Sequence, residues 1–245
     1  MGGITLYDPV ETDASFDHLV RIAKKLGDGL AVVGGWAVHL LVRDSFRRAT
    51  GLDYLRSRDI DVVISTDNRY VARFKAGIER MGFAPGGLPF RYQLVLDRET
   101  RRVLDERSAK KRHTFDLLHI DLDVLSSKKV GMATWVMKDL RGALDRKVIV
   151  DGIPVARADR VLRMKLASIG MRENADKKEK DACDIYALLF YSELKPSIEI
   201  PAVQLFQFAE GYSTIIAETL FNDGGQAGII RRNLDRLLMG TGSTK

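Results

Sequence analysis

Cysteine is almost absent from this chain, and histidine is scarce. The 245 residues include a single cysteine, Cys183, and only four histidines. One thiol cannot form an internal disulfide, and four scattered histidines provide no zinc-binding pattern. A disulfide-stapled scaffold and a structural zinc site are therefore excluded, and we expect a protein of the reducing cytoplasm.

Long apolar runs and the common glycine motifs of nucleotide enzymes are also missing. No apolar stretch approaches the roughly 20 residues that span a bilayer, so no membrane partner is expected. The segment Met1–Leu6 has neither the basic region nor the apolar core of a secretory signal. The chain lacks Gly-x-Gly-x-x-Gly and a P-loop, which argues against a dinucleotide-binding enzyme and a P-loop NTPase.

The composition that is present is that of a globular domain with a basic balance. Apolar residues make up 45% of the chain and charged residues 29%, and the formal net charge is +6. A basic excess favours an anionic partner, either a nucleotide or a nucleic acid. Basic clusters occur at Arg47-Arg48, Arg56/Arg58, Arg101-Arg102, Lys110-Lys111-Arg112 and Arg231-Arg232.

The run from Leu30 to Ile64 carries the main pattern. Leu30–Val33 is apolar and predicts a strand, Gly34-Gly35 predicts a tight turn, and Trp36–Val42 begins a helix. A polar loop is expected over Ser45–Gly51. The following segment, residues 57–65, alternates into an apolar run and predicts a strand that enters the core.

Two carboxylates on this second strand indicate a cation site. Asp59 and Asp61 are two residues apart, so on a strand they project to the same side. Two carboxylates about 4 Å apart repel by roughly 4 kcal/mol at an effective dielectric of 20, and bound Mg²⁺ can offset this repulsion. Gly34 and Gly35 would let backbone N–H groups approach an anion at a helix start. A phosphate site facing a carboxylate metal site is the layout for nucleotidyl transfer.

A third carboxylate is expected on the segment Phe115–Leu125, which predicts another strand. Asp121 and Asp123 share one face of it, and either could complete a triad. Asp116 has the opposite parity and is predicted to be structural.

These motifs resemble a known superfamily. Gly34-Gly35-Trp36-Ala37 followed by Arg58-Asp59-Ile60-Asp61 resembles the signature of the DNA polymerase β-like nucleotidyltransferases. The chain is similar to their abortive-infection and toxin-type members, and also to aminoglycoside and lincosamide nucleotidyltransferases. The resemblance implies Mg²⁺ or Mn²⁺ ions held by Asp59, Asp61 and a third acid on the neighbouring strand. Asp123 is preferred for that acid, because Asp123-Val124-Leu125 resembles the family's acid and apolar pair, and Asp121 remains open.

The resemblance also implies residues that contact the nucleoside triphosphate. Gly34 and Gly35 would seat its phosphates, with Ser57, Arg58 and Lys165 as charge-stabilising contacts. A helix carrying Lys165 and Arg172, followed by one with Lys-Asp-x-x-Asp, is similar to the toxin-type enzymes. There the lysine is implied to contact the nucleotide phosphates, and Asp181 or Asp184 is implied to support the nucleotide site. Cys183 is predicted to be a buried helix residue.

The expected fold class is α+β, with a nucleotidyltransferase-type mixed sheet flanked by helices and a C-terminal helical subdomain. The predicted domains are 1–156 and 157–245. Expected helices cover Thr12–Lys25 with a cap at Thr12 or Asp13, residues 68–81, and the chain from Ala158. Further elements are expected as follows: a loop at Asp105–His113, a hairpin at Val148–Val155 turning at Asp151-Gly152, and helices at Ala202–Ala209, Tyr212–Phe221 and Gln226–Leu238, broken at Gly211 and Gly224-Gly225.

The predicted function is transfer of NMP from an NTP to an acceptor hydroxyl. The basic balance and the toxin-type resemblance favour an RNA end, such as that of tRNA, as acceptor, and they imply an antitoxin protein as a further partner. A small hydroxylated molecule such as an antibiotic is the alternative acceptor, although a cationic aminoglycoside would want an acidic pocket. A catalytically silent module that binds nucleotide, RNA or a protein is the alternative outside enzymes.

Overall fold

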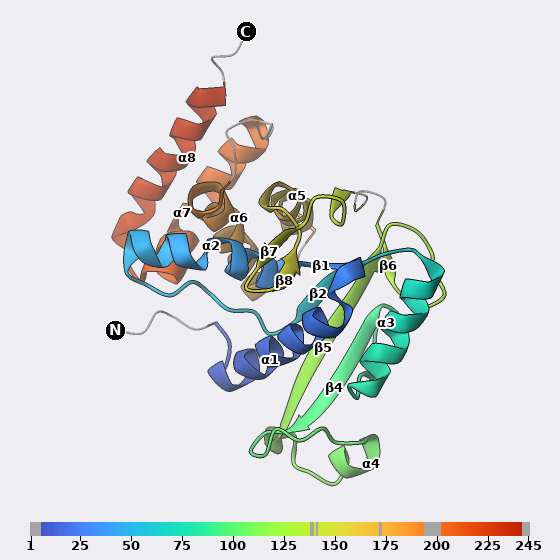
Figure 1. The fold of residues 1–245 in the computed structure, drawn as a ribbon. Coiled ribbons are helices and arrows are strands. Elements are labelled where there is room, and N and C mark those ends of the chain that lie inside the picture. Colours follow the sequence, from blue (N-terminus) through green and yellow to red (C-terminus); the bar gives the residue numbers. More distant parts are fainter. Residues whose placement is uncertain (1–5, 138–139, 141, 172, 194–201, 242–245) are drawn as a thin grey trace. The chain divides into compact units, whose positions relative to one another are not determined.

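The computed structural model describes residues 6–137, 140, 142–171, 173–193 and 202–241, drawn in colour in Figure 1. The chain divides into two compact units. The sheet unit comprises residues 6–40 and Arg56–Arg160. The helical unit comprises Leu41–Leu55 and the chain from Val161 onward. The segment Leu41–Leu55 therefore belongs with the C-terminal helices, although the sequence suggested one boundary near residue 157.

The sheet unit is built around a mixed sheet. Its strands are β1 (Leu30–Val33), β2 (Ile60–Ile64), β3 (Ala84–Pro85), β4 (Arg91–Asp97), β5 (Leu117–Ser126), β6 (Trp135–Val136), β7 (Val148–Val150) and β8 (Ile153–Val155). The order is β3-β4-β5-β2-β1-β8-β7, and β6 pairs with the end of β5. β2 and β5 run parallel, as do β1 and β8, whereas β4 is antiparallel to β5 and β1 to β2.

Helices cover one face of this sheet. The helices of the unit are α1 (Pro9–Leu26), the start of α2 (Gly34–Thr50), α3 (Asn68–Arg80) and the short α4 (Glu106–Ala109). α1 contacts β5, β8 and α3, and Figure 1 shows α1 and α3 together over the sheet. On β5 the side chains of Leu118, Ile120 and Leu122 are buried, while Leu117, His119 and Asp121 between them are partly exposed. Burial therefore alternates from Leu117 to Leu122, as one covered and one open face require, whereas every residue from Leu122 to Ser126 is buried.

The first helix begins earlier than the sequence indicated. Asp8 caps α1 by accepting a hydrogen bond from Val10 N at 2.8 Å, and Pro9 occupies the first turn. The predicted cap at Thr12 or Asp13 is wrong, because an aspartate followed by proline is the stronger start signal. The predicted end is confirmed, since Gly27 is the C-cap.

The expected loop over Ser45–Gly51 is also wrong. α2 runs without a break from Gly34 to Thr50. Phe46 is fully buried and packs edge-on against Tyr54 and Tyr191 at ring-centroid distances of 5.3 and 5.0 Å within the helical unit. Burial of this side chain stabilises the last turns of the helix, whose surface positions are polar.

The remaining helices belong to the helical unit: α5 (Ala158–Ile169), whose first residues lie in the sheet unit, α6 (Ala175–Tyr191), α7 (Ala202–Phe221) and α8 (Ala227–Thr241). The predicted break at Gly211 is wrong, because α7 passes through it. The break at Gly224-Gly225 is confirmed as a short 3-10 turn over Gly224–Gln226. Among the described residues, no helix is both long and apolar enough to cross a bilayer.

Two local predictions in the sheet unit have opposite outcomes. The hairpin at Val148–Val155 is confirmed, with positive φ at Asp151 (50°) and Gly152 (76°) as a type I′ turn requires. The loop expected at Asp105–His113 instead contains α4, which Asp105 caps by accepting from Ser108 N at 2.7 Å. The predicted fold class, a mixed sheet flanked by helices with further helices at the C-terminal end, is confirmed.

Candidate active site

The predicted carboxylates meet where β2 and β5 pair. In this parallel pairing Asp61 lies directly opposite Asp123. Neighbouring strands are about 4.8 Å apart, so the two acids are adjacent in space. Asp59 comes one residue before β2, and its side chain is 24% exposed. Strand pairing therefore brings Asp61 and Asp123 together, whereas Asp59 lies in the bend that leads into β2.

The glycine turn lies against this pair. Gly34 starts α2 directly after β1 and has a φ of +65°. A Cβ at this position would meet Asp61 Oδ2 at 1.9 Å, so no larger residue fits without displacing the carboxylate. Trp36 is fully buried and donates from Nε1 to Ser15 Oγ at 2.9 Å, which ties the start of α2 to α1. The predicted contact between the Gly34-Gly35 turn and the acids is thus present at Gly34.

Sequence reasoning missed an arginine in this cluster. Arg91 on β4 is paired in register with Asp123. Its Nε and Nη2 donate to the two oxygens of Asp123 at 2.7 and 2.8 Å, and its Nη1 donates to Asp121 Oδ2 at 2.8 Å. The hydrogen bonds that Arg91 donates to Asp123 raise the pKa of the Arg91 guanidinium, against a smaller effect of burial, and the charges of Asp121 and Asp59 act in the same direction as Asp123. Asp59 contributes the smallest of these effects.

Asp121 and Asp123 differ in their surroundings. Asp121 accepts from Arg91 through one oxygen and from Gln93 Nε2 at 2.9 Å through the other. Asp123 faces Asp61 across the β2–β5 pairing, which Asp121 does not. The geometry thus favours Asp123 as the partner of Asp61. The sequence holds one signal for the contact of Arg91 with the acids. Arg91 and Gln93 are two residues apart on a predicted strand, with the same spacing as Asp121 and Asp123.

Ser57 and Arg58 lie in the chain just before β2. Ser57 is buried, and its hydroxyl donates to the backbone oxygen of Asp59 at 3.3 Å. The Arg58 side chain is 44% exposed, with Nε 3.5 Å from Asp59 Oδ1 and its guanidinium 5.5 Å from the Tyr7 ring centroid. Ser57 therefore supports the loop that presents Asp59. The contact of either residue with a nucleotide stays a prediction.

A second cluster of predicted residues lies in the helical unit. Lys165 on α5 donates from Nζ to Asp181 Oδ1 at 2.5 Å and lies 2.7 Å from Asp184 Oδ2, both on α6. Lys165 is 8% exposed, Asp181 3% and Asp184 0%. Charges removed from water to this extent are stable only when they are paired and hydrogen-bonded. The cluster therefore fixes α5 against α6.

Among the described residues, three further side chains join this cluster. Lys180 Nζ lies 3.2 Å from both oxygens of Asp184, Tyr54 donates to Asp184 Oδ1 at 2.7 Å, and Ser168 donates to Asp181 Oδ2 at 3.2 Å. The two lysines and two aspartates give the cluster a balanced formal charge.

The protonation states follow from this pairing. Burial alone would raise the pKa of Asp184, but Lys165 and Lys180 outweigh it and hold the pKa below the ordinary value. Burial alone would likewise lower the pKa of Lys165, but Asp184 and Asp181 hold it above the ordinary value. Both groups are therefore charged near neutral pH. Cys183, beside Asp184, is fully buried as predicted, and burial raises the pKa of its thiol.

The predicted site residues thus form two clusters, one in each unit. The structure shows a structural contact for Lys165, and its contact with nucleotide phosphates stays a prediction. Arg172 lies outside the described residues. Within the described part of the chain, no three His, Cys, Asp or Glu side chains are arranged as a ready metal site.

The carboxylate cluster nonetheless has the donor chemistry of a magnesium site. Carboxylate oxygens are the hard ligands that Mg²⁺ takes in proteins. Each carboxylate oxygen offers about two lone pairs, so Asp123 keeps acceptor capacity on both oxygens while Arg91 is bound. Asp61 and Asp123 therefore fit a divalent cation by type and adjacency, and Asp59 fits it by type.

No known protein-family model matches this chain, and no curated protein matches it in sequence. Among solved structures, the chain is similar to JHP933 from Helicobacter pylori, with 14% identity, a TM-score of 0.50 and 96% of each chain covered. It also matches an antigenic nucleotidyltransferase-like protein from Paracoccidioides brasiliensis, with 17% identity, a TM-score of 0.47 and 94% and 92% covered. A third match is the antibiotic-resistance factor ANT(2'')-Ia, with 13% identity, a TM-score of 0.37 and 72% and 89% covered. At 14% identity the likeness to JHP933 concerns the fold alone, and the two lower scores support no further conclusion.

Proposed function

We propose that this protein is a nucleotidyltransferase of the DNA polymerase β-like type, which moves NMP from an NTP to an acceptor hydroxyl. The observation that carries the proposal is the pairing of Asp61 with Asp123 beside the Gly34 turn. An acid pair alone is common at strand ends. An acid pair packed against the bare backbone of a helix start supports the proposal of a cation site next to an anion site.

Asp59, Asp61 and Asp123 would hold Mg²⁺ or Mn²⁺, with Asp121 beside them. When bound, the metal supplies charge neutralisation of the triphosphate and Lewis-acid activation of the acceptor hydroxyl. The chain's own residues then bind the triphosphate and orient it. The backbone N–H groups at Gly34 and Gly35 begin α2, where the helix dipole favours a phosphate.

The transfer itself forms one bond and breaks one. The acceptor oxygen bonds to the α-phosphorus of the NTP, the α–β phosphoanhydride bond breaks, and pyrophosphate leaves. The acceptor proton passes to the nearest carboxylate of the cluster, which acts as general base. Arg91 acts as a positioning residue, because its fork fixes both oxygens of Asp123. Arg58, partly exposed beside Asp59, would stabilise charge on the leaving phosphates.

The buried cluster in the helical unit has a supporting role in this proposal. Asp181 and Asp184 hold Lys165 between α5 and α6. A phosphate that reached Lys165 would have to replace one of these carboxylates as its partner. Lys180 would then neutralise the negative charge of the other carboxylate. The nucleotide contact of Lys165 is therefore proposed as an exchange of anions.

We place the acceptor hydroxyl on an RNA end. The support is the net charge of +6, which favours a polyanion over a cationic aminoglycoside. Acceptor binding to RNA would weaken steeply with salt, whereas binding of an uncharged antibiotic would not. An antitoxin that covers the acidic cluster would be expected to carry a cationic segment.

The second candidate is a catalytically silent module of the same fold that binds nucleotide or RNA. One observation favours it: Arg91 already neutralises Asp121 and Asp123. An arginine in this place could substitute for a metal ion in a protein that no longer carries out transfer.

The test is to incubate the purified protein with Mg²⁺ and each α-labelled NTP in turn, with total RNA or a panel of small hydroxylated acceptors. The wild type should label one acceptor class, and Asp61→Asn should lower the rate by about 100-fold or more. Asp17→Asn, at an exposed position of α1, is the matched control. A wild-type rate in the Asp61→Asn variant would refute the mechanism. A melting shift with NTP and Mg²⁺, without pyrophosphate release from any acceptor, would favour the silent module.

A further inference from the structure

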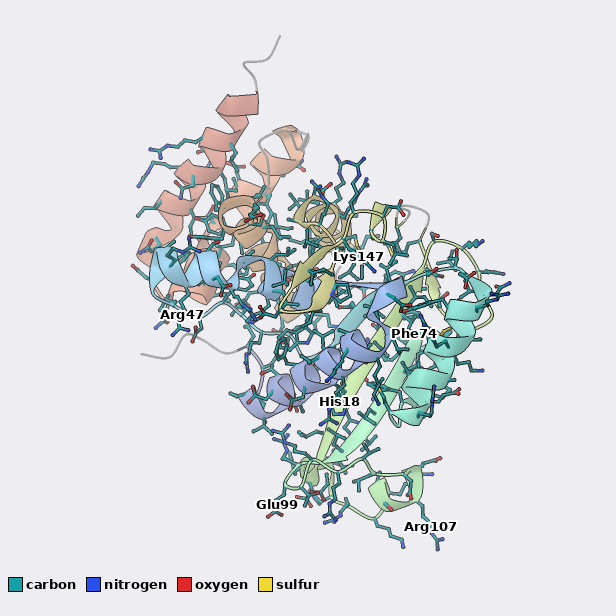
Figure 2. All side chains as sticks on the ribbon, in the orientation of Figure 1. His18, Arg47, Phe74, Glu99, Arg107 and Lys147 are labelled. Atoms are coloured by element: carbon teal, nitrogen blue, oxygen red, sulfur yellow. The ribbon has the colours of Figure 1, made fainter. Side chains whose placement is uncertain are left out.

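The sheet unit carries an exposed basic segment at the end of the β4–β5 hairpin. Residues 101–116, here called the basic arm, connect the two strands and include α4. Every residue from Lys110 to Asp116 is exposed. Figure 2 shows Glu99 and Arg107 at this end of the sheet unit, and Figure 1 shows α4 beyond the ends of the strands.

The arm exposes an aromatic platform. The Phe115 side chain is 79% exposed, the highest value among the large apolar side chains that the structure describes. His113 stacks on it, with ring centroids 5.2 Å apart and an angle of 20° between the planes. A local hydrogen bond from Phe115 N to His113 Nδ1, at 3.5 Å, holds the two residues together, so their rings present one stacked surface to solvent.

The same arm also carries exposed cations. Lys110 pairs with Glu106 at 2.6 Å and Arg112 with Asp97 at 3.3 Å. In contrast, Arg102, Arg107 and Lys111 are exposed and form no ion pair with another described residue. Exposed rings and exposed cations on one short segment match a single-stranded nucleic acid, whose bases stack on rings while its phosphates bind lysine and arginine.

A partly exposed strip leads from the arm to the carboxylates. On β5 the open face carries Leu117, His119, Asp121 and Asp123 in alternation, and Val95, Gln93 and Arg91 of β4 lie beside them in register. Six residues of strand separate Leu117 from Asp123, which corresponds to about 20 Å. A strand held on the arm could therefore reach the acids with a few nucleotides.

We infer that the basic arm is a docking site for single-stranded nucleic acid. Phe115 and His113 stack against a base, and Arg102, Arg107 and Lys111 contact phosphates. The inference concerns binding alone and does not rest on the proposed transfer reaction, although it would supply that reaction with an RNA acceptor.

The test is fluorescence anisotropy of a labelled, unstructured 12-nucleotide RNA and of the DNA of the same sequence, without NTP or metal, over a series of salt concentrations. Phe115→Ala should raise the Kd by about fivefold or more, the lower bound for losing one stacked base. Arg107→Gln/Lys111→Gln should reduce the slope of log K against log salt by about 1.4, since each phosphate contact on a single strand contributes about 0.7.

Lys24→Gln/Lys25→Gln is the matched control, because it removes two exposed charges from α1 in the same unit. It should leave the slope within experimental error of that of the wild type. The inference is overturned if the arm variants and the control behave alike, or if the arm variants lose binding to anionic phospholipid vesicles while binding to both oligonucleotides is unchanged. Because metal and NTP are absent, loss of transfer activity in the Asp61→Asn variant would have no bearing on this result. Equal weakening for RNA and DNA supports recognition of the shared chemistry, and weakening for RNA alone supports a role of the 2′-hydroxyl.

Discussion

Replacing Asp184 by asparagine should unfold the helical unit at much milder conditions. Asp184 is fully buried, lies 2.7 Å from Lys165 Nζ and 3.2 Å from Lys180 Nζ, and accepts from Tyr54. The substitution preserves size but removes one of the two carboxylates that pair with these ammonium groups among the described residues, and Asp181 is the other. Removing one partner from a buried ion pair costs about 3–5 kcal/mol. For a chain of this size that corresponds to a fall in Tm of about 6–20 °C.

The assay is urea and thermal unfolding followed by two probes. Both tryptophans, Trp36 and Trp135, lie in the sheet unit, so their fluorescence reports on that unit, while far-UV circular dichroism reports on all helices. The dichroism transition of Asp184→Asn should move to lower urea while the fluorescence transition moves less. Tyr54→Phe removes one hydrogen bond and should cost about 1 kcal/mol.

Asp176→Asn is the surface control for this experiment. Asp176 lies exposed in the first turn of the same helix, and its loss should cost less than about 1 kcal/mol. If Asp184→Asn is as stable as this control, the buried charges do not hold α5 and α6 together, and the reasoning fails.

Three further predictions concern the sheet unit. Gly34→Ala should destabilise the sheet unit by more than the roughly 1–2 kcal/mol that a positive φ costs an alanine, because the new Cβ would meet Asp61 Oδ2. Gly152→Ala is the control in urea unfolding, because Gly152 has a φ of +76° and open space around it, so this variant measures the cost of the positive φ alone. The Arg91→Gln variant should bind Mn²⁺ at least about tenfold more tightly in calorimetry, because the substitution removes a positive charge that faces the acids. An unchanged affinity would contradict the idea that Arg91 and the metal ion compete for these carboxylates. Burial lowers the pKa of His18 below its ordinary 6.5. The contribution of the neutral ring to stability is therefore present above pH 6.5 and is lost on acidification. His18→Gln should remove that part of the pH dependence of the free energy of unfolding.

Strand parity made the acidic cluster predictable. Residues two apart on a strand share a face whatever the rest of the fold does. Asp59 and Asp61 could therefore be assigned to one face of their predicted strand, and Asp121 and Asp123 to one face of theirs. Arg91 could not be placed in the same way. Its contact with Asp123 depends on the register of β4 against β5, which is fixed by the pairing along the whole hairpin.

Helix ends were less predictable, because packing overrides local preference. Gly211 lies exposed within α7, where glycine costs about 1 kcal/mol relative to alanine. The buried Ile216 and Ala217 on the same helix favour its continuation by more than that. In the same way, burial of Phe46 extends α2 through residues that resemble a polar loop.

The grouping of Leu41–Leu55 with the C-terminal helices has a consequence for synthesis on the ribosome. Phe46 packs against Tyr191 and Phe221, so this early segment completes its packing only after most of the chain has been translated. At 5–20 residues per second, the interval between Leu55 and Phe221 lasts about 10–30 s. During that time the nascent chain exposes an apolar segment, and after Arg160 it does so although every residue of the sheet unit has been translated. Exposed apolar segments are the kind of surface that chaperones bind.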